Sequence, residues 1–254
     1  MPTTPPTQQV ALTRLGFRPF FLCSTLFATV SMLVWLSIIA FATNPPVMPP
    51  ALWHGHEMVY GYALAVVAGF LLTAVRNWTG VQTLHGTPLM LLVLLWLLAR
   101  LIPYAGNDSA LPLMMALDLS FNIALCLAIL HPVIKDGHYK SLGVWFILIA
   151  ITVSNLLFYL GLPGITPNGV QVGLHSGLYL IIFLMLLPGR RVLPMFITNG
   201  VDYPVTLTNR RWLDISCLLL MLLFVMVQVF VPQSALASLC AGLLFLLHAI
   251  RISG

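Results

Sequence analysis

The sequence predicts an all-α membrane protein, a polytopic bundle of about eight transmembrane helices with both termini in the cytoplasm. Of its 254 residues, 60% are hydrophobic and only 7% are charged, whereas soluble domains usually carry about 25% charged residues. Apolar runs long enough to cross a bilayer recur along the chain, and the lysines and arginines lie at their ends. A water-soluble domain is therefore excluded, because too few polar groups are present to cover its surface.

A polar tail of residues 1–16 precedes a membrane domain that we expect over residues 17–251. The first apolar run is too long for the apolar segment of a signal peptide, so it predicts a membrane anchor. Proline, glycine and asparagine residues separate the later runs. The expected spans cover residues 17–42, 52–75, 87–105, 111–131, 141–161, 169–188, 211–231 and 234–250.

The positive charges predict how the spans are oriented. With the N-terminus in the cytoplasm, every one of the 11 lysines and arginines except Arg100 lies at a cytoplasmic flank, as the positive-inside rule requires. Seven or nine spans would break this alternation. The basic residues stand singly or in pairs, so we expect the lipid bilayer as a partner and no nucleic acid.

Small residues recur at every fourth position in two of the spans. The repeats are Gly61, Ala65 and Gly69 in the second span and Gly169, Gly173 and Gly177 in the sixth. Such stripes let helix backbones approach closely in lipid. We therefore expect close packing there and treat the second and sixth spans as candidate neighbours.

Ionisable residues at membrane depth are costly, and they usually face the interior of a bundle and serve a function. Counted at 1.5 Å per residue, Glu57, Asp118, Asn155 and His175 lie about 8–10 Å inward from the outer ends of their spans. Arg100 approaches the same level from the opposite direction. We therefore expect one polar layer in the outer leaflet, to which four or five helices contribute.

The segment Trp53–Met58 reads Trp-His-Gly-His-Glu-Met and lies at the outer mouth of the second span. On a regular helix His54 shares a face with Glu57, while His56 points about 200° away. The two imidazoles therefore bind one ion only if the helix starts late or is distorted. Neutral imidazole is a ligand for haem iron and copper. We take His54, His56 and His175 as candidate metal ligands, against the alternative of a solvated histidine pair at the interface.

Asp118 and Asn122 lie one turn apart on the fourth span. They would orient a ligand imidazole by hydrogen bonding or join neighbouring helices, and the sequence leaves both roles open. Glu57, Asn155 and Arg100 are expected in the same supporting or acid–base role. No catalytic residue is predicted, because neither an H-E-x-x-H zinc motif nor a haem-stacking histidine pair on one span is present.

Short motifs over essentially the whole chain resemble those of the NnrS family. They are Gly16–Phe21, Leu52–Met58, Gly69–Val75, Asn77–Gly80 and Gly189–Gly200. The resemblance implies a multi-pass protein of the bacterial inner membrane that carries haem b and copper, with a role in denitrification and in the response to nitric oxide. It also implies that His54 and His56 are the metal ligands. Arg18 would then contact haem propionates or inner lipid headgroups.

The chain departs from the family pattern in two respects. Arg76 stands where the family has proline before the Asn77–Gly80 motif. The family's later helices, which bring further histidines, do not follow His248. We therefore expect a shortened member or a fragment, which would work with an additional membrane subunit.

Three functions are compatible with these residues. The first is haem binding in the nitric oxide response, with nitric oxide as ligand or as substrate, so that enzyme activity stays open. The second is a small-solute or proton-coupled transporter lined by Glu57, Asp118 and Arg100, which predicts discontinuous helices and an internal repeat. The third is a non-catalytic assembly partner that lacks the family's last helices.

Overall fold

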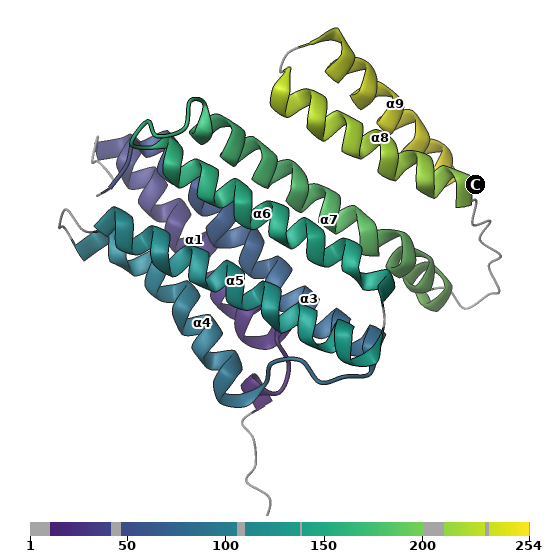
Figure 1. The fold of residues 1–254 in the computed structure, drawn as a ribbon, viewed down its shortest axis with the longest axis horizontal. Coiled ribbons are helices and arrows are strands. Elements are labelled where there is room, and N and C mark those ends of the chain that lie inside the picture. The colour runs from purple at the N-terminus through teal and green to yellow at the C-terminus, as the bar shows by residue number, and fades with distance from the viewer. Residues whose placement is uncertain are drawn as a thin grey trace, which may run out of the picture.

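The structure is a computed structural model that describes residues 11–41, 47–105, 110–137, 139–200, 211–231 and 234–253. All regular structure in these residues is helical, and the long helices lie side by side as a bundle (Figure 1). The polytopic helical bundle expected from the sequence is therefore confirmed.

The helices follow the apolar runs of the sequence. In chain order they are α1 (Phe17–Phe41), α2 (Pro50–His56), α3 (Leu64–Thr79), α4 (Gly86–Leu101), α5 (Ala110–Asp136), α6 (Leu142–Gly161), α7 (Gly169–Gly200), α8 (Arg211–Phe230) and α9 (Ala235–Ser253). A π-helical segment, η2 (Glu57–Ala63), joins α2 to α3, so Pro50–Thr79 is one continuous span. Short 3₁₀ turns are η1 (Ala11–Thr13), η3 (Ile102–Ala105) and η4 (Tyr139–Ser141).

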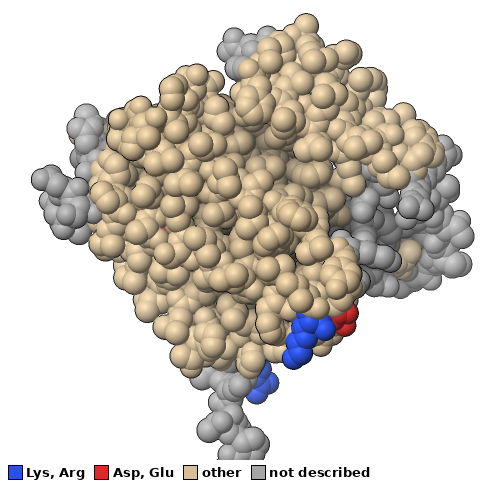
Figure 2. All heavy atoms as spheres, viewed as in Figure 1, with Lys and Arg blue, Asp and Glu red and all other residues tan. Residues whose placement is uncertain are grey.

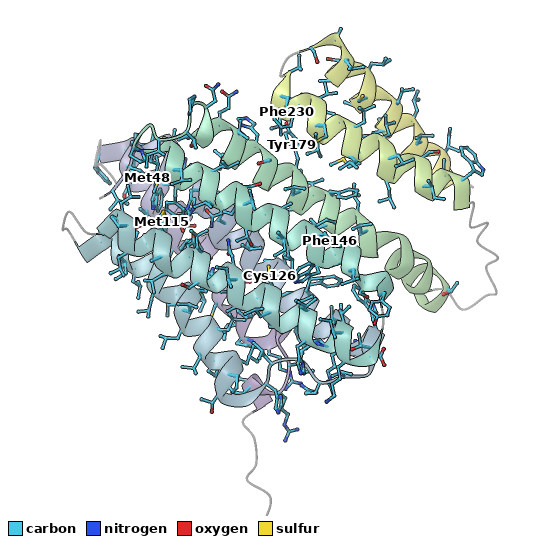
Figure 3. The ribbon with its side chains drawn as sticks, viewed as in Figure 1. Met48, Met115, Cys126, Phe146, Tyr179 and Phe230 are labelled. Carbon is cyan, nitrogen blue, oxygen red and sulfur yellow. The ribbon has the colours of Figure 1, made fainter. Side chains whose placement is uncertain are left out.

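Six helical stretches are long and apolar enough to cross a bilayer, and α8 and α9 carry shorter apolar stretches. The six are Phe17–Phe41, Pro50–Thr79, Gly86–Tyr104, Ala110–Asp136, Leu142–Gly161 and Gly169–Leu187. Large aromatic side chains such as Phe146 and Phe230 are more than half exposed on the outside of the bundle (Figure 3). Such exposure is favourable in lipid and costly in water, so the protein is a multi-pass membrane protein.

Local chemistry explains where the second span begins and ends. Pro50 is its first residue, where the missing N–H costs nothing and the fixed φ suits a helix. Gly80 follows its last residue with a φ of 69°, and its N–H donates to the Arg76 carbonyl oxygen at 2.9 Å. This left-handed cap needs glycine, so the Asn77–Gly80 motif is a helix stop.

In the described part of the chain, exposed charge lies at one end of the bundle. Among the side chains that the structure describes, the exposed charged ones are Arg14, Lys135 and Asp136. Figure 2 shows the few charged atoms visible on one face at its lower edge, with an uncharged surface above them. This end is the one that the sequence places in the cytoplasm.

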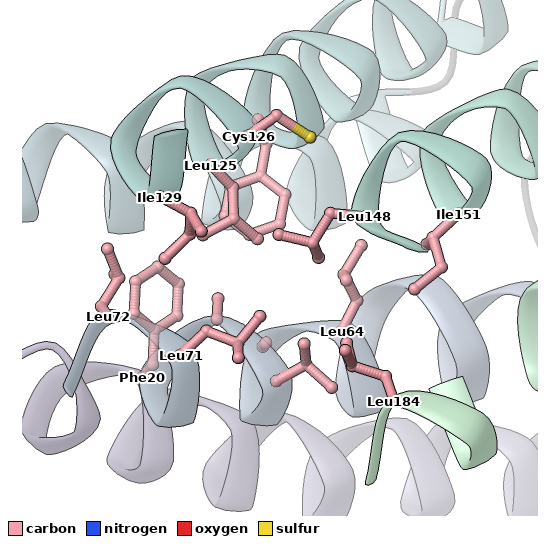
Figure 4. Packing of buried hydrophobic residues seen from close by; sticks show 14 of the residues in the cluster. Phe20, Leu64, Leu71, Leu72, Leu125, Cys126, Ile129, Leu148, Ile151 and Leu184 are labelled. Carbon is pink, nitrogen blue, oxygen red and sulfur yellow. The ribbon is translucent and has the colours of Figure 1, made fainter. Parts of the chain in front are cut away.

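An apolar core fills the bundle between α1, α3, α4, α5, α6 and α7 on the side of the predicted cytoplasmic end. Its members are at most 9% exposed, and they point toward one another from facing helices (Figure 4). They include Phe20, Leu64, Leu71, Leu72, Leu125, Ile129, Leu148, Ile151 and Leu184. Leucine is the commonest residue in this cluster, which we call the apolar core.

The glycine stripe of the sixth span packs chiefly on α6. A Cβ at Gly173 would lie 2.5 Å from the backbone nitrogen of Phe158, so only glycine allows this approach. The stripe also meets the second span, because the Tyr60 hydroxyl donates to the Gly173 carbonyl oxygen at 2.6 Å. A Cβ at Gly177 would collide with the same hydroxyl. The expected contact between the second and sixth spans is confirmed, although α6 is the main neighbour.

The helices α8 and α9 form a hairpin at the edge of the bundle, next to α7 (Figure 1, yellow). One link is the edge-on contact between Tyr179 of α7 and Phe224 of α8, whose ring centroids are 5.3 Å apart. The buried polar side chains of the described residues lie outside this hairpin.

Candidate functional site

The middle of the second span is a π-helix. Glu57–Ala63 form this segment, and the backbone N–H of Leu64 donates to the carbonyl oxygen of Val59, five residues back. The wider turn changes which faces the residues before and after it occupy, so the spacing of a regular α-helix does not hold across it. Such turns are rare and often occur at functional sites. The apolar pattern of the sequence gave no sign of this one.

Four buried side chains close a ring of charged contacts at the start of the π segment. The Arg100 guanidinium donates from Nη1 to Glu57 Oε2 at 3.0 Å and from Nη2 to Asp118 Oδ1. His56 completes the ring, since its Nδ1 lies 3.2 Å from Glu57 Oε1 and its Nε2 lies 3.4 Å from Asp118 Oδ2. All four residues are at most 3% exposed. We call His56, Glu57, Arg100 and Asp118 the charged ring.

Two side chains of α6 support the charged ring. Asn155 donates from Nδ2 to Asp118 Oδ2 at 3.2 Å, and its Oδ1 lies 3.1 Å from His56 Nε2. The Tyr159 hydroxyl donates to Asp118 Oδ2 at 3.0 Å. Polar contacts therefore join the second span, α4, α5 and α6 at one level of the bundle.

The partners of His56 fix its protonation state. Its Nδ1 faces a carboxylate oxygen of Glu57, and its Nε2 faces the amide oxygen of Asn155. The orientation of that amide is set because its nitrogen donates to Asp118. Since these oxygens only accept, both nitrogens of His56 must donate, which makes the ring an imidazolium. Two cations then balance two carboxylates, as buried charges require.

The π segment makes room for the charged ring. A Cβ at Gly61 would lie 2.6 Å from Glu57 Oε2 and 2.8 Å from Arg100 Nη1, so a larger residue would displace both side chains. The Gly61 carbonyl oxygen accepts a hydrogen bond from Trp96 Nε1 at 2.9 Å. Trp96 lies one turn before Arg100 on α4, and it therefore ties α4 to the π segment beside the ring.

The structure brings together four of the five residues of the expected polar layer and leaves one apart. Glu57, Arg100, Asp118 and Asn155 contact one another directly, whereas His175 is exposed on α7. The depths expected from the rise per residue agree with these contacts. Depth alone does not determine which face of α7 carries His175.

The other candidate residues lie outside the charged ring. His54 is half-buried and stacks on Trp35 of α1, with ring centroids 4.4 Å apart. Asn122 is buried one turn from Asp118. Arg18 lies at the start of α1, with its guanidinium carbon 5.8 Å from the centre of the Phe17 ring.

Sequence reasoning missed three aromatic residues that complete the site. Tyr159 lies one turn after Asn155 on α6. Because residues at i and i+4 share a helix face, this spacing could have predicted that Tyr159 faces the polar layer. Tyr60 and Trp96 carry polar atoms into the bundle, where each needs a partner. Both donate to carbonyl oxygens of glycines in the small-residue stripes.

A model of the family described as NnrS protein matches residues 11–254. The chain belongs to the NnrS family. No curated protein and no solved structure gave a match.

The histidines of this NnrS protein differ in whether they are free to bind a metal. Both nitrogens of His56 are engaged in the charged ring. His54 has a buried Nδ1 without a hydrogen-bond partner among the described residues. His175 lies with Nδ1 2.8 Å from the Gln171 carbonyl oxygen, so Nδ1 donates and Nε2 carries the lone pair of the neutral ring. Metal-binding histidines commonly make this kind of hydrogen bond from the other ring nitrogen.

His54 and His175 in this NnrS protein face different surroundings. His54 turns toward Trp35, whereas His175 lines a shallow groove that also includes Leu52, Asn168 and Gln171. In the described part of the chain, no three His, Cys, Asp or Glu side chains are grouped to hold a metal ion. Within the described residues the histidines offer single imidazoles, which is a donor that a haem iron could use.

Proposed function

We propose that this NnrS-family protein binds haem b in the bacterial inner membrane and acts in the response to, and tolerance of, nitric oxide in denitrifying metabolism. Family membership supports the proposal. The observation that carries it is His175, whose Nδ1 donates to the Gln171 carbonyl oxygen and whose side chain lines a groove. When bound, a haem would supply an iron that can bind a diatomic molecule such as nitric oxide.

Each residue has a defined part in this proposal. His175 is the first candidate for the axial ligand, and Leu52 and Leu174 give the groove apolar walls against which a porphyrin would pack. His54 is the second candidate, because its Nδ1 lacks a partner among the residues described. We assign Arg18 to inner lipid headgroups, since it lies at the far end of α1 from Trp35 and His54.

The charged ring has a supporting part. Its hydrogen bonds outside the ring go to Asn155 and Tyr159 of α6, and both nitrogens of His56 are engaged. Its His56 is the last residue of α2, and Gly55 of α2 packs against Leu174, which lines the groove. We therefore propose that the ring fixes the position of α2, which forms one wall of the groove.

Copper is the second metal that the family resemblance implies. The described residues offer no group of three or more histidine, cysteine or carboxylate ligands for it. We therefore propose copper as an accompanying metal without naming its ligands. Metal analysis of the purified protein decides this point, and an absence of copper would leave the haem proposal intact.

The test is the haem content of the full chain, purified in detergent from cells that are supplied with a haem precursor. We expect a Soret band, and we expect His175→Ala to remove most of it. His54→Ala tests the second ligand in the same way. His85→Ala is the matched control. His85 is exposed in the loop after α3, at the opposite end of the second span from Leu52 of the groove. A colourless wild-type preparation would overturn the haem proposal.

The role of nitric oxide needs a separate measurement. Anaerobic addition of nitric oxide to the reduced protein is expected to shift the Soret band, and cells that lack the gene are expected to grow less well under nitric oxide. If haem is bound but neither effect is seen, the cofactor proposal stands and the proposed physiological role is wrong.

A further inference from the structure

Asn122 is a buried amide that none of its described neighbours satisfies. It lies on α5 one turn from Asp118 and is 2% exposed. Within the described residues, neither its Nδ2 nor its Oδ1 has a hydrogen-bond partner. An unpaired amide is costly in any protein interior, and within a membrane span no bulk water is present to form hydrogen bonds with it. A native membrane protein rarely keeps such a group dry.

The nearest polar residue along the helix cannot serve Asn122. Asp118 already accepts hydrogen bonds from Arg100, Asn155 and Tyr159, and His56 lies against its second oxygen. The residues beside Asn122 in sequence, and those one turn further along α5, are apolar, and they include Phe121, Leu125 and Cys126. The partner must therefore come from outside the side chains of this helix.

The chemistry of the amide identifies the partner. Asn122 presents one unpaired donor group and one unpaired acceptor, and a water molecule complements both. A cation would use the oxygen alone, and the carboxylate that could help to bind it is already fully engaged. An anion would use the nitrogen alone and would lie close to the negative charge of Asp118. We infer that Asn122 holds an ordered internal water.

A second observation agrees with water at this level of the bundle. Arg100 donates from both of its terminal nitrogens, but its Nε is buried and has no partner within the described chain. Buried waters typically make about three hydrogen bonds to groups of this kind. The water site extends the polar network one helical turn beyond the charged ring, toward the apolar core, and it does not depend on the proposed haem.

Water-edited solid-state NMR on the ¹⁵N-labelled full chain in lipid bilayers tests this inference. The side-chain amide of Asn122 is expected to receive magnetisation from water earlier than that of Asn155, which is equally buried but donates directly to Asp118. Asn77, which is exposed, gives the upper reference. Single substitutions such as Asn122→Gln assign the signals.

Two results would overturn the inference. One is a build-up for Asn122 that is no faster than the build-up for Asn155, which would mean that the amide is dry. The other is an experimental density map that resolves ordered waters elsewhere in the bundle but shows none within hydrogen-bond distance of Asn122. The expected map shows one water that contacts both Nδ2 and Oδ1.

Discussion

In the outer half of the bundle, α2 and η2 of the second span meet α4 and α5 through the charged ring. The other half is held together by the apolar core. Lipid tails are as apolar as leucine, so burying leucine between helices gives little net driving force in a membrane. Many arrangements of the apolar core would pack similarly well. The charged ring, in contrast, is satisfied only when His56, Glu57, Arg100 and Asp118 meet. The charged ring therefore specifies which helices are neighbours, and the apolar core fills the space between them.

The largest expected effect comes from removing one charge of the ring. Arg100→Met leaves two buried carboxylates opposed by one imidazolium, and it should lower the free energy of unfolding by about 3–5 kcal/mol. Denaturant unfolding in mixed micelles measures this. Lys135→Met is the control, because Lys135 is exposed at the cytoplasmic end, and we expect no measurable change. Equal effects of the two substitutions would contradict the comparison.

Conservative substitutions should separate the two halves more sharply. Asp118→Asn keeps the size of the side chain but loses the charge that faces Arg100, and it should cost about 3 kcal/mol. Leu125→Met in the apolar core keeps volume and polarity, and it should cost less than about 1.5 kcal/mol. The same unfolding assay compares them. A larger loss from the methionine would show that the apolar core is the more specific half.

The close contact between α6 and α7 should be the next most sensitive feature. Gly173→Val adds carbon atoms where even a Cβ would lie 2.5 Å from the Phe158 backbone nitrogen, and overpacking of this kind costs about 1–3 kcal/mol. Gly143→Ala is the matched control, because nothing lies within 4 Å of a Cβ there. If both variants unfold like the wild type, the close approach of the helices is wrong.

The smallest expected effect is the loss of one supporting hydrogen bond. Tyr159→Phe removes one donor from Asp118 and leaves its other donors in place, so a loss of about 1 kcal/mol is expected. Tyr62→Phe serves as the control on an exposed tyrosine. A loss as large as that of Arg100→Met would mean that Tyr159 is a full member of the ring.

Composition and run length predicted the fold well, because a membrane leaves few alternatives to the helix. The sequence also predicted the depth of Glu57, Asp118 and Asn155, since rise per residue is fixed in a helix. It could not predict that His56 joins them. His56 was expected to point away from the face of His54 and Glu57, and which neighbour it meets depends on the π segment and on the packing of α6.

In general, the sequence did not predict which way a side chain faces around its helix. His175 lies at the expected level but faces the outside of α7. The π segment within the continuous span Pro50–Thr79 was likewise not expected from the sequence. These features depend on tertiary contacts between distant segments, which periodicity within one span does not record.

The most direct test of the charged ring is a double-mutant cycle on Arg100 and Asp118. Together, Arg100→Met and Asp118→Leu remove one charge of each sign and leave His56 and Glu57 to balance each other. We predict that the double variant is more stable than the sum of the single losses implies, with an interaction energy of about 2–3 kcal/mol. Losses that add to within about 0.5 kcal/mol would show that the two residues act independently, and they would contradict the ring as the element that joins these helices.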